Sequence, residues 1–186
     1  MKRRYHYLLA LVALAISFIY DRQLLIAITS YRTANLDFIF KTFSLLGSLI
    51  FIPLLAASVV MFYRKKNQNI TAIWTSTGIA VAITYFVKYL VNRDRPDFAS
   101  PLEEISSPGF PSAHASASFA PAPILQSNMK KLWILFAIFV AFSRVYLGVH
   151  YVSDVIAGSI LGNIVGDLTA KIPFSKIKIL RKLRIA

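Results

Sequence analysis

The sequence contains no cysteine and few charged residues, and its charges are strongly unequal in sign. Without cysteine, the chain has neither a disulfide framework nor a thiolate metal site. Charged residues make up 16% of the 186 positions, whereas an ordinary soluble domain carries about 25%. Hydrophobic residues make up 56%, so the composition predicts a membrane protein.

By itself, an excess of basic residues would suggest a nucleic-acid partner. Lysine and arginine number 21 against eight acidic residues, which gives a net charge of +13. The basic residues form short runs between apolar segments, however, and no basic helix face with interleaved aromatic residues is present. We therefore expect no nucleic-acid partner. We interpret the basic tail at 176–184 as a solvated segment that rests on anionic lipid headgroups, with calmodulin-like or nucleic-acid recognition by this tail as the alternative.

Apolar segments long enough to cross a bilayer recur along the chain. A spanning helix needs roughly 20 mostly apolar residues, and five segments come close to this, at 6–20, 39–63, 70–91, 131–148 and 151–170. A sixth, 113–127, is weaker because it is rich in small and polar residues and contains Pro121 and Pro123. Its small residues predict close packing against a neighbouring helix. Residues 22–36 are too short and polar to span, and we expect an amphipathic helix along the outer interface or a loop there.

The distribution of basic residues favours six spans with both termini in the cytoplasm. In that arrangement 14 of the 21 basic residues lie on the cytoplasmic side, as the positive-inside rule predicts. Deleting the span at 113–127 would break the alternation. A cleaved signal peptide is the alternative at the N-terminus, but the apolar run continues beyond "ALA" to Tyr20. We predict an all-α integral-membrane protein with a single domain, 1–186, in the cell (inner or plasma) membrane.

Three polar segments then fall on the extracytoplasmic side. They are 88–96 at the end of the third span, 111–114 at the start of the fourth, and 143–154 across the last turn. A charge at bilayer depth costs about 2.5–3.5 kcal/mol, so such residues normally face a cavity and one another. Taken singly, each has a structural explanation, such as snorkelling of Lys88 or an ion pair within one helix. Their joint position on one side favours a common site.

The residue types in these segments suit an anion, and a phosphoryl group fits best. Cations, hydroxyls and the free backbone N–H groups of a helix starting near Ala113 are natural phosphate ligands. Two histidines allow one to attack phosphorus while the other protonates the leaving oxygen. A helix that starts near His150 would place Asp154 on the same face. Metal-assisted hydrolysis is the alternative, although the surrounding cations would repel a metal ion.

Together the three segments resemble the motifs of the type 2 phosphatidic acid phosphatase (PAP2) superfamily, in its membrane-bound lipid phosphatase branch. They read Lys88-x6-Arg95-Pro96, Pro111-Ser112-Ala113-His114 and Ser143-Arg144-x5-His150-x3-Asp154. The resemblance implies that His150 is the nucleophile, Asp154 its orienting partner and His114 the general acid. It implies a phosphate-binding set made of Lys88, Arg95, Ser112, Ala113 and Arg144. It also implies that neither a metal nor another cofactor is needed.

One position departs from the family pattern. Ala113 stands where the family usually has glycine. A methyl group there matters only if the backbone needs positive φ or approaches the phosphate very closely. We expect an altered rate or substrate choice and not inactivity. Arg93 and Asp94, inside the spacer of the first motif, have no family role that we can assign.

The resemblance implies a phosphatase acting on a lipid phosphomonoester or diphosphate at the extracytoplasmic face, through a phosphohistidine. Candidate substrates are undecaprenyl or another polyprenyl diphosphate, phosphatidylglycerophosphate, phosphatidate and the 1-phosphate of lipid A. The expected partners are this lipid and the bilayer, with no obligate protein partner. Two alternatives use the same cations without chemistry: an anionic-lipid transporter or flippase, and a catalytically inactive scaffold.

Overall fold

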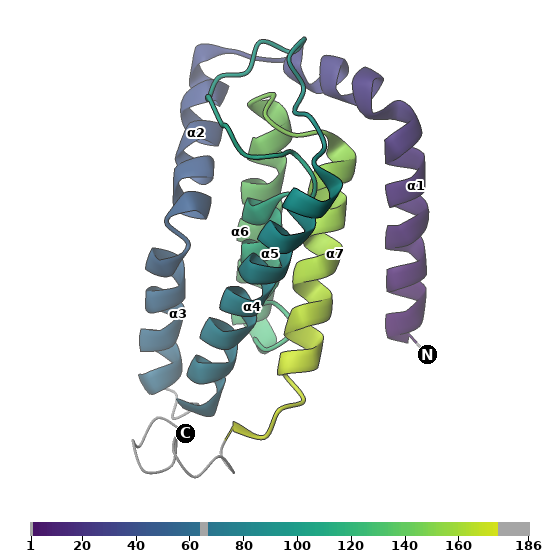
Figure 1. The fold of residues 1–186 in the computed structure, drawn as a ribbon. Helices are drawn as coiled ribbons and strands as arrows, with labels where there is room; N and C mark the ends of the chain where they lie inside the picture. Colours follow the sequence, from purple (N-terminus) through teal and green to yellow (C-terminus); the bar gives the residue numbers. More distant parts are fainter. Residues whose placement is uncertain (1, 64–66, 175–186) are drawn as a thin grey trace.

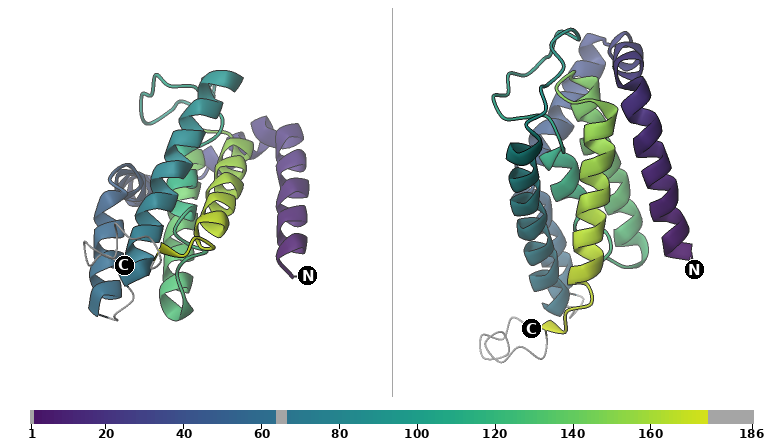
Figure 2. Two further views of the ribbon diagram at one scale, coloured as in Figure 1. Left: turned by 60° about the horizontal axis from the view of Figure 1, so that its bottom comes forward. Right: turned by 45° about the vertical axis from the view of Figure 1, so that its right-hand side comes forward.

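The computed structural model describes residues 2–63 and 67–174, and regular structure in this part of the chain is helical throughout. The helices found there are α1 (Lys2–Thr29), α2 (Ala34–Ser48), α3 (Phe51–Tyr63), α4 (Asn67–Val91), α5 (Ala113–Phe119), α6 (Ser127–Tyr146) and α7 (Val152–Thr169). They form an elongated bundle in which α1 begins at the end where α7 finishes (Figures 1 and 2). The predicted all-α class is confirmed.

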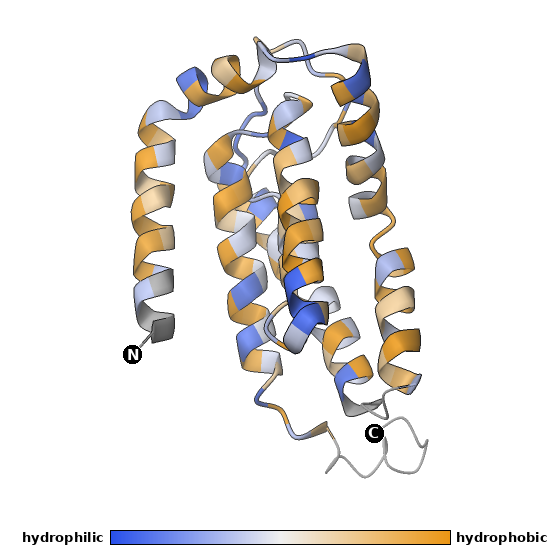
Figure 3. Cartoon of the chain, turned by 180° about the vertical axis from the view of Figure 1, so that it is seen from behind, coloured by the Kyte–Doolittle hydropathy of each residue, from blue (hydrophilic) through white to orange (hydrophobic). Residues whose placement is uncertain are grey.

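Several helices of the bundle are long and apolar. Within the described residues, Tyr7–Thr29 of α1 and Asn69–Val91 of α4 are long and apolar enough to cross a membrane, and the bent pair α2–α3 would add a third span. Apolar side chains face outward along these helices, as Leu9 and Ile19 do with exposures of 67% and 71%. Figure 3 shows this apolar character along much of the helical surface. An exposed apolar surface of this kind suits contact with lipid, and the number of spans stays a prediction.

The predicted span at 39–63 is broken into two helices. α2 ends at Ser48, α3 begins at Phe51, and the two are bent by 69°. Pro53 explains the break, because its ring would clash with the carbonyl of Leu49 and it has no N–H to continue the helix. In the first turn of α3 the same proline is tolerated, since no helical partner awaits an N–H there.

The predicted span at 113–127 is helical only in its first half. α5 ends at Phe119, and residues 120–126 continue through turns into α6. Pro121 and Pro123 account for this, because proline removes a helical donor and disfavours helical geometry in the residue before it. Figure 1 shows that α5 and α6 begin towards opposite ends of the bundle, so the chain still alternates in direction.

Residues 22–36 do not form a separate interfacial helix. Residues 22–29 complete α1, residues 30–33 turn, and α2 starts after Thr33, whose hydroxyl accepts from the N–H of Leu36. In Figure 1 the last turns of α1 lean across the end of the bundle towards α2. The basic tail at 176–184 lies outside the described residues.

A close contact between α5 and α7 fixes the centre of the bundle. α7 presents Gly158, Gly162 and Gly166 to α5 at one-turn intervals. A Cβ added at Gly162 would overlap the carbonyl oxygen of Ser116, and the other two glycines meet α5 and the turn after it in the same way. Such contacts require glycine, because they bring two backbones together. They hold the helix that begins with the second motif against the helix that carries Asp154.

Candidate active site

The three motifs meet at the end of the bundle opposite the start of α1 (Figure 1). The first lies at the end of α4 and in the following loop, 92–112. The second leads into α5, and the third spans the turn between α6 and α7. Backbone contacts join them, since the N–H of Ser112 donates to the carbonyl of Asp154 at 2.9 Å and Gly109 N–H donates to the carbonyl of Arg93 at 2.7 Å.

His150 and Asp154 form a buried pair. His150 Nδ1 lies 3.2 Å from Asp154 Oδ2, and the two residues are 2% and 0% exposed. Asp154 sits in the first turn of α7, where Oδ2 also accepts the N–H of Tyr151 at 3.0 Å. A carboxylate in this position satisfies a free donor at the start of the helix. The same oxygen therefore caps α7 and holds the imidazole.

Arg95 determines which nitrogen of His150 carries the proton. Its Nη1 lies 3.1 Å from His150 Nε2. A guanidinium can only donate, so Nε2 accepts through its lone pair and Nδ1 holds the hydrogen that faces Asp154. Burial, followed by the positive charges of Arg95, Arg144 and Lys88, holds the pKa of His150 well below its ordinary value of 6.5. At neutral pH the imidazole is therefore neutral, and its Nε2 is unprotonated and accepts from Arg95.

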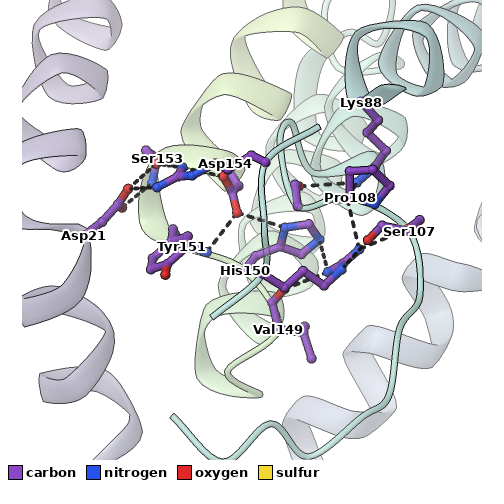
Figure 4. Close-up of polar contacts among 12 residues, drawn as sticks. Asp21, Lys88, Ser107, Pro108, Val149, His150, Tyr151, Ser153 and Asp154 are labelled. Carbon is purple, nitrogen blue, oxygen red and sulfur yellow. Dashed lines mark hydrogen bonds and ion pairs between the residues drawn. The ribbon is translucent and has the colours of Figure 1, made fainter. Parts of the chain in front are cut away.

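Main-chain carbonyls fix the positions of Lys88 and Arg95. Lys88 Nζ donates to the carbonyls of Pro108 and Gly109, the latter at 3.3 Å. Arg95 donates to the carbonyls of Ser107 at 2.7 Å and Val149 at 2.6 Å. Burial and the nearby charge of Arg144 lower the pKa of Arg95 to about 10, so it stays charged at neutral pH. Figure 4 shows Lys88, Pro108 and Ser107 on one side of His150.

Buried donors without partners lie in the second and third motifs. Arg144 is 1% exposed, and within the described chain its Nε and Nη2 have no hydrogen-bond partner. Its Nη1 donates to Glu103 Oε2 at 2.8 Å and to the hydroxyl of Ser44. The hydroxyl of Ser112 is also buried, again with no partner among the described residues. A buried unsatisfied polar group costs about 1–3 kcal/mol, so these groups suit an anionic ligand.

His114 joins the cluster from α5. It is half-buried, and its Nε2 lies 2.8 Å from the hydroxyl of Ser48 at the end of α2. It interacts electrostatically with four site residues, which are Arg144, His150, Arg95 and Lys88. The imidazole of His114 is thus held beside the cations by Ser48 of α2, a helix that contains none of the three motifs.

Ala113 starts α5 and is half-buried. Among the described non-glycine residues, only Asn92, Ser100 and Ser127 have positive φ. The methyl group of Ala113 therefore causes no backbone strain of the kind that would require glycine. The effect of this departure from the family pattern on rate stays a prediction.

Four residues that contact the site were missed by the sequence analysis. Ser44 and Glu103 hold Arg144, while Arg93 and Asp21 connect to Asp154. Arg93, which had no assignable role, donates to Asp154 Oδ1 at 2.7 Å. Asp21 was the one member of this group with a visible signal, because an acidic residue inside an apolar helix calls for a partner.

An open cavity adjoins the cluster. Its volume is about 610 Å³, and its lining includes Arg95, Asp97, Glu103 and Glu104 of the loop 92–112. The described residues contain no group of three or more His, Cys, Asp or Glu side chains that could hold a metal ion.

Cations gather around a neutral histidine at one end of an apolar helical bundle, an arrangement that suits an anionic ligand. The sequence pattern of the PAP2 superfamily matches residues 69–178, which is more than half of the chain. The chain therefore belongs to the PAP2 superfamily.

Relatives with known names agree with this assignment. The chain is 28% identical to the lipid A 4'-phosphatase of Bacteroides thetaiotaomicron, over 80% of this chain and 74% of the relative. It is 33% identical to the undecaprenyl-diphosphatase of Sulfolobus acidocaldarius, over 69% and 68%. The named relatives are lipid phosphatases, and the predicted family and enzyme class, a PAP2 hydrolase of lipid phosphoesters, are confirmed.

Two solved structures share the fold. The first is the transmembrane PAP2 type phosphatidylglycerolphosphate phosphatase from Bacillus subtilis, with a TM-score of 0.73 and 27% identity over 88% of this chain and 91% of that one. The second is LpxE of Aquifex aeolicus, with a TM-score of 0.67 and 26% identity over 82% and 95%. The helical arrangement is thus the PAP2 fold.

Proposed function

We propose that the protein hydrolyses a lipid phosphomonoester or diphosphate through a phosphohistidine formed on His150. One observation carries the proposal: Nε2 of His150 presents a lone pair to Arg95, while Nδ1 is held by the buried carboxylate of Asp154. A nucleophile needs this combination, because the attacking nitrogen must be unprotonated and the cation that forms on the ring must be stabilised.

The reaction has two steps. Nε2 attacks phosphorus and the bond from phosphorus to the leaving oxygen breaks, while His114 donates a proton to that oxygen. A water molecule then attacks phosphorus, the bond to Nε2 breaks, and His114 recovers a proton from the water. For a monoester the products are a lipid alcohol and inorganic phosphate, and for a diphosphate they are a lipid monophosphate and inorganic phosphate.

The phosphate-binding set is Lys88, Arg95, Ser112, Ala113 and Arg144. The two unpartnered nitrogens of Arg144 and the hydroxyl of Ser112 support this role, because phosphate oxygens would satisfy them. Lys88 uses two of its three ammonium hydrogens on carbonyls and has one left. Ala113 would contribute its backbone N–H. These fixed donors are also positioned to stabilise the charge that develops on phosphorus in the transition state.

We propose six membrane crossings, both termini in the cytoplasm and an active site at the extracytoplasmic face of the cell membrane. The broken pair α2–α3 would form one crossing, and α5 with the turns after it another. The basic runs near the termini support this orientation, because such runs favour the cytoplasmic side. The whole chain would act as one domain.

The substrate class is a lipid phosphate whose headgroup reaches the cavity beside Arg95. Candidates are polyprenyl diphosphate, phosphatidylglycerophosphate, phosphatidate and lipid A phosphate, and the named relatives act on lipids of these kinds. The acids around the cavity, Asp97, Glu103 and Glu104, favour hydroxyl-bearing headgroups over further phosphates near that wall.

The test is release of inorganic phosphate from each of these lipids by the purified, detergent-solubilised protein. His150→Ala should abolish release, and His6→Ala, at the histidine outside the motifs, should leave it unchanged. Radiolabelled phosphate should appear on wild-type protein as a base-stable, acid-labile adduct that His150→Ala lacks. Wild-type rates in His150→Ala would disprove the mechanism. Transport of labelled lipid into proteoliposomes without phosphate release would instead support the flippase alternative.

A further inference from the structure

Arg93 and Asp21 lie behind the pair of His150 and Asp154. Figure 4 shows Asp21 and Ser153 on one side of His150 and Lys88 on the other. Neither Arg93 nor Asp21 belongs to the residues expected to bind phosphate. Asp21 also lies outside the stretch 69–178 that matches the superfamily pattern.

The two oxygens of Asp154 have different partners. Oδ2 faces His150 and the N–H of Tyr151, at 3.2 and 3.0 Å. Oδ1 accepts from Arg93 Nη1 at 2.7 Å. Because Asp154 is fully buried, Arg93 is the group that fixes the free end of its carboxylate. Rotation of Asp154 away from the imidazole would break that salt bridge.

Asp21 holds Arg93 from α1. Arg93 Nη2 lies 2.8 Å from Asp21 Oδ2. Asp21 Oδ1 accepts the N–H of Ser153 at 2.9 Å, and the Ser153 hydroxyl donates to the other oxygen. Asp21 therefore binds a free N–H in the first turn of α7, the helix that carries Asp154. A carboxylate that is only 5% exposed inside an apolar helix is costly unless it is paired in this way.

Local structure directs Arg93 into this position. Asn92, with φ of 47°, ends α4 in the left-handed conformation that asparagine tolerates. The guanidinium of Arg93 then lies between two rings, 5.2 Å from the centre of Phe18 and 4.3 Å from that of Tyr151. The Arg93 side chain is thus held by two rings and two carboxylates, which come from α1 and from the start of α7.

We propose that Arg93 and Asp21 are a positioning pair for the nucleophile, acting through Asp154 and not on the substrate. The inference rests on the proposed role of His150. During attack the imidazole becomes cationic, and Asp154 must face Nδ1 throughout. Arg93 locks the carboxylate, while Asp21 locks Arg93 and balances its charge. Outer partners of this kind typically change activity without contacting the reacting atoms.

The pair has a kinetic signature that a merely structural role would not produce. Arg93→Gln should lower kcat about 10- to 100-fold, the usual scale for such partners. KM should stay within about two-fold, because no substrate contact is lost. Removing the positive charge should also move the acid limb of kcat/KM to higher pH, because protonated His150 is repelled less and its pKa rises. Asp21→Asn should lower kcat too, but should move that limb to lower pH.

The direction of the pH shift depends on the other charged and titratable groups that face His150. These are Arg95, Arg144, Lys88, Asp154 and the second histidine, His114, and none of them changes in either variant. Arg93→Lys keeps the charge but cannot bridge two carboxylates with separate nitrogens. It should therefore show an intermediate kcat with the acid limb of the wild type.

The experiment measures kcat, KM and the pH profile on the best lipid substrate, with thermal unfolding of each variant recorded alongside. Arg22→Gln is the matched control: this neighbour of Asp21 is exposed and lies over Phe98, and its kinetics should be those of the wild type. Wild-type kcat in Arg93→Gln, or a raised KM with unchanged kcat, would overturn the inference. If Arg93→Gln does not fold, wild-type kcat and acid limb in both Arg93→Lys and Asp21→Asn would overturn it. Full activity in His150→Ala would instead remove the proposed function itself.

Discussion

Arg144 binds Glu103 at 2.8 Å with only one of its three guanidinium nitrogens, and the other two are buried without a partner in the described chain. Glu103 therefore fixes the guanidinium through Nη1, while the edge formed by Nε and Nη2 is free to bind a ligand. The salt bridge aims the guanidinium, and in the proposed role of Arg144 its free edge would present two parallel donors to a phosphate.

Arg144→Lys should raise KM for the lipid phosphate and lower kcat/KM by about 100-fold, because lysine cannot present two parallel donors. Steady-state kinetics on the best substrate of the panel tests this. Lys131→Arg, at a basic residue far from the motifs in the sequence, should leave both constants unchanged. An unchanged KM in Arg144→Lys would argue against phosphate binding by the free edge.

Glu103→Gln should lower KM by about two- to five-fold at low ionic strength. The change removes a negative charge beside the phosphate but keeps a hydrogen-bond acceptor for Arg144. Glu104→Gln, the same change in a neighbouring acid of the cavity wall, shows how much of the effect comes from charge at that wall and not from Glu103 itself. A KM that rises in Glu103→Gln would show that the charge of Glu103, and not only its geometry, is needed to orient Arg144.

Activity should persist on the acid side of the ordinary histidine range. Protonation of Nε2 removes the attacking lone pair, so the rate is lost as pH falls through the pKa of His150. Because that pKa lies well below 6.5, the acid limb of kcat/KM should also lie below 6.5. A profile measured between about pH 4 and pH 9 reports the ionisations of the free enzyme. An acid limb at or above the ordinary value would contradict the neutral state assigned to His150.

Divalent-metal chelators should leave phosphate release unchanged, whereas vanadate should inhibit competitively. The described residues offer cations and histidines to a phosphate mimic but no cluster of metal ligands. Both compounds can be titrated in one assay, with a metal-dependent phosphatase as the chelator control. Loss of activity in chelator that added metal restores would revive the metal-assisted mechanism.

Gly162→Ala should destabilise the protein by about 1–3 kcal/mol, the range for an overpacked core. The added methyl group would overlap the carbonyl of Ser116 and push α5 from α7. Gly78→Ala is the control, because a Cβ there meets nothing within 4 Å and alanine favours a helix. Thermal unfolding in detergent should separate the two variants, and equal midpoints would show that the α5–α7 contact tolerates the methyl group.

The three motifs were more predictable from the sequence than the residues that surround them in the fold. Lys88, Arg95 and His150 stand at fixed spacings that belong to one family, so their proximity followed from the motifs alone. The pairing of His150 with Asp154 was expected from a helix that starts near His150; α7 begins two residues later, at Val152, and the pair still forms. These relationships are local, or are specified by motif, and need no knowledge of how distant helices pack.

Arg93, Asp21, Ser44 and Glu103 could not be found in this way. Each acts across 41 to 132 positions of sequence, as the bonds of Arg144 to Glu103 and of Ser153 to Asp21 illustrate. Those contacts arise only when α1, α2 and the loop 92–112 pack against the start of α7 and the end of α6. The break within 39–63 was missed for another reason: hydropathy sums over a window and does not register that the single Pro53 ends a helix. In 113–127, by contrast, Pro121 and Pro123 had already marked the segment as the weaker span.

The bend between α2 and α3 separates two helices with different contacts. α2 supplies the hydroxyls of Ser44 and Ser48, one turn apart, to Arg144 and His114. α3 instead contributes Leu54, Ala57 and Met61 to an apolar core with α4 and α6. Since the joint lies between the two, substitutions that lengthen or shorten the apolar face of α3 can adapt the protein to bilayers of different thickness. The hydroxyls of Ser44 and Ser48 would keep their places through such substitutions, so the length of the apolar face can change without a change in the contacts to Arg144 and His114.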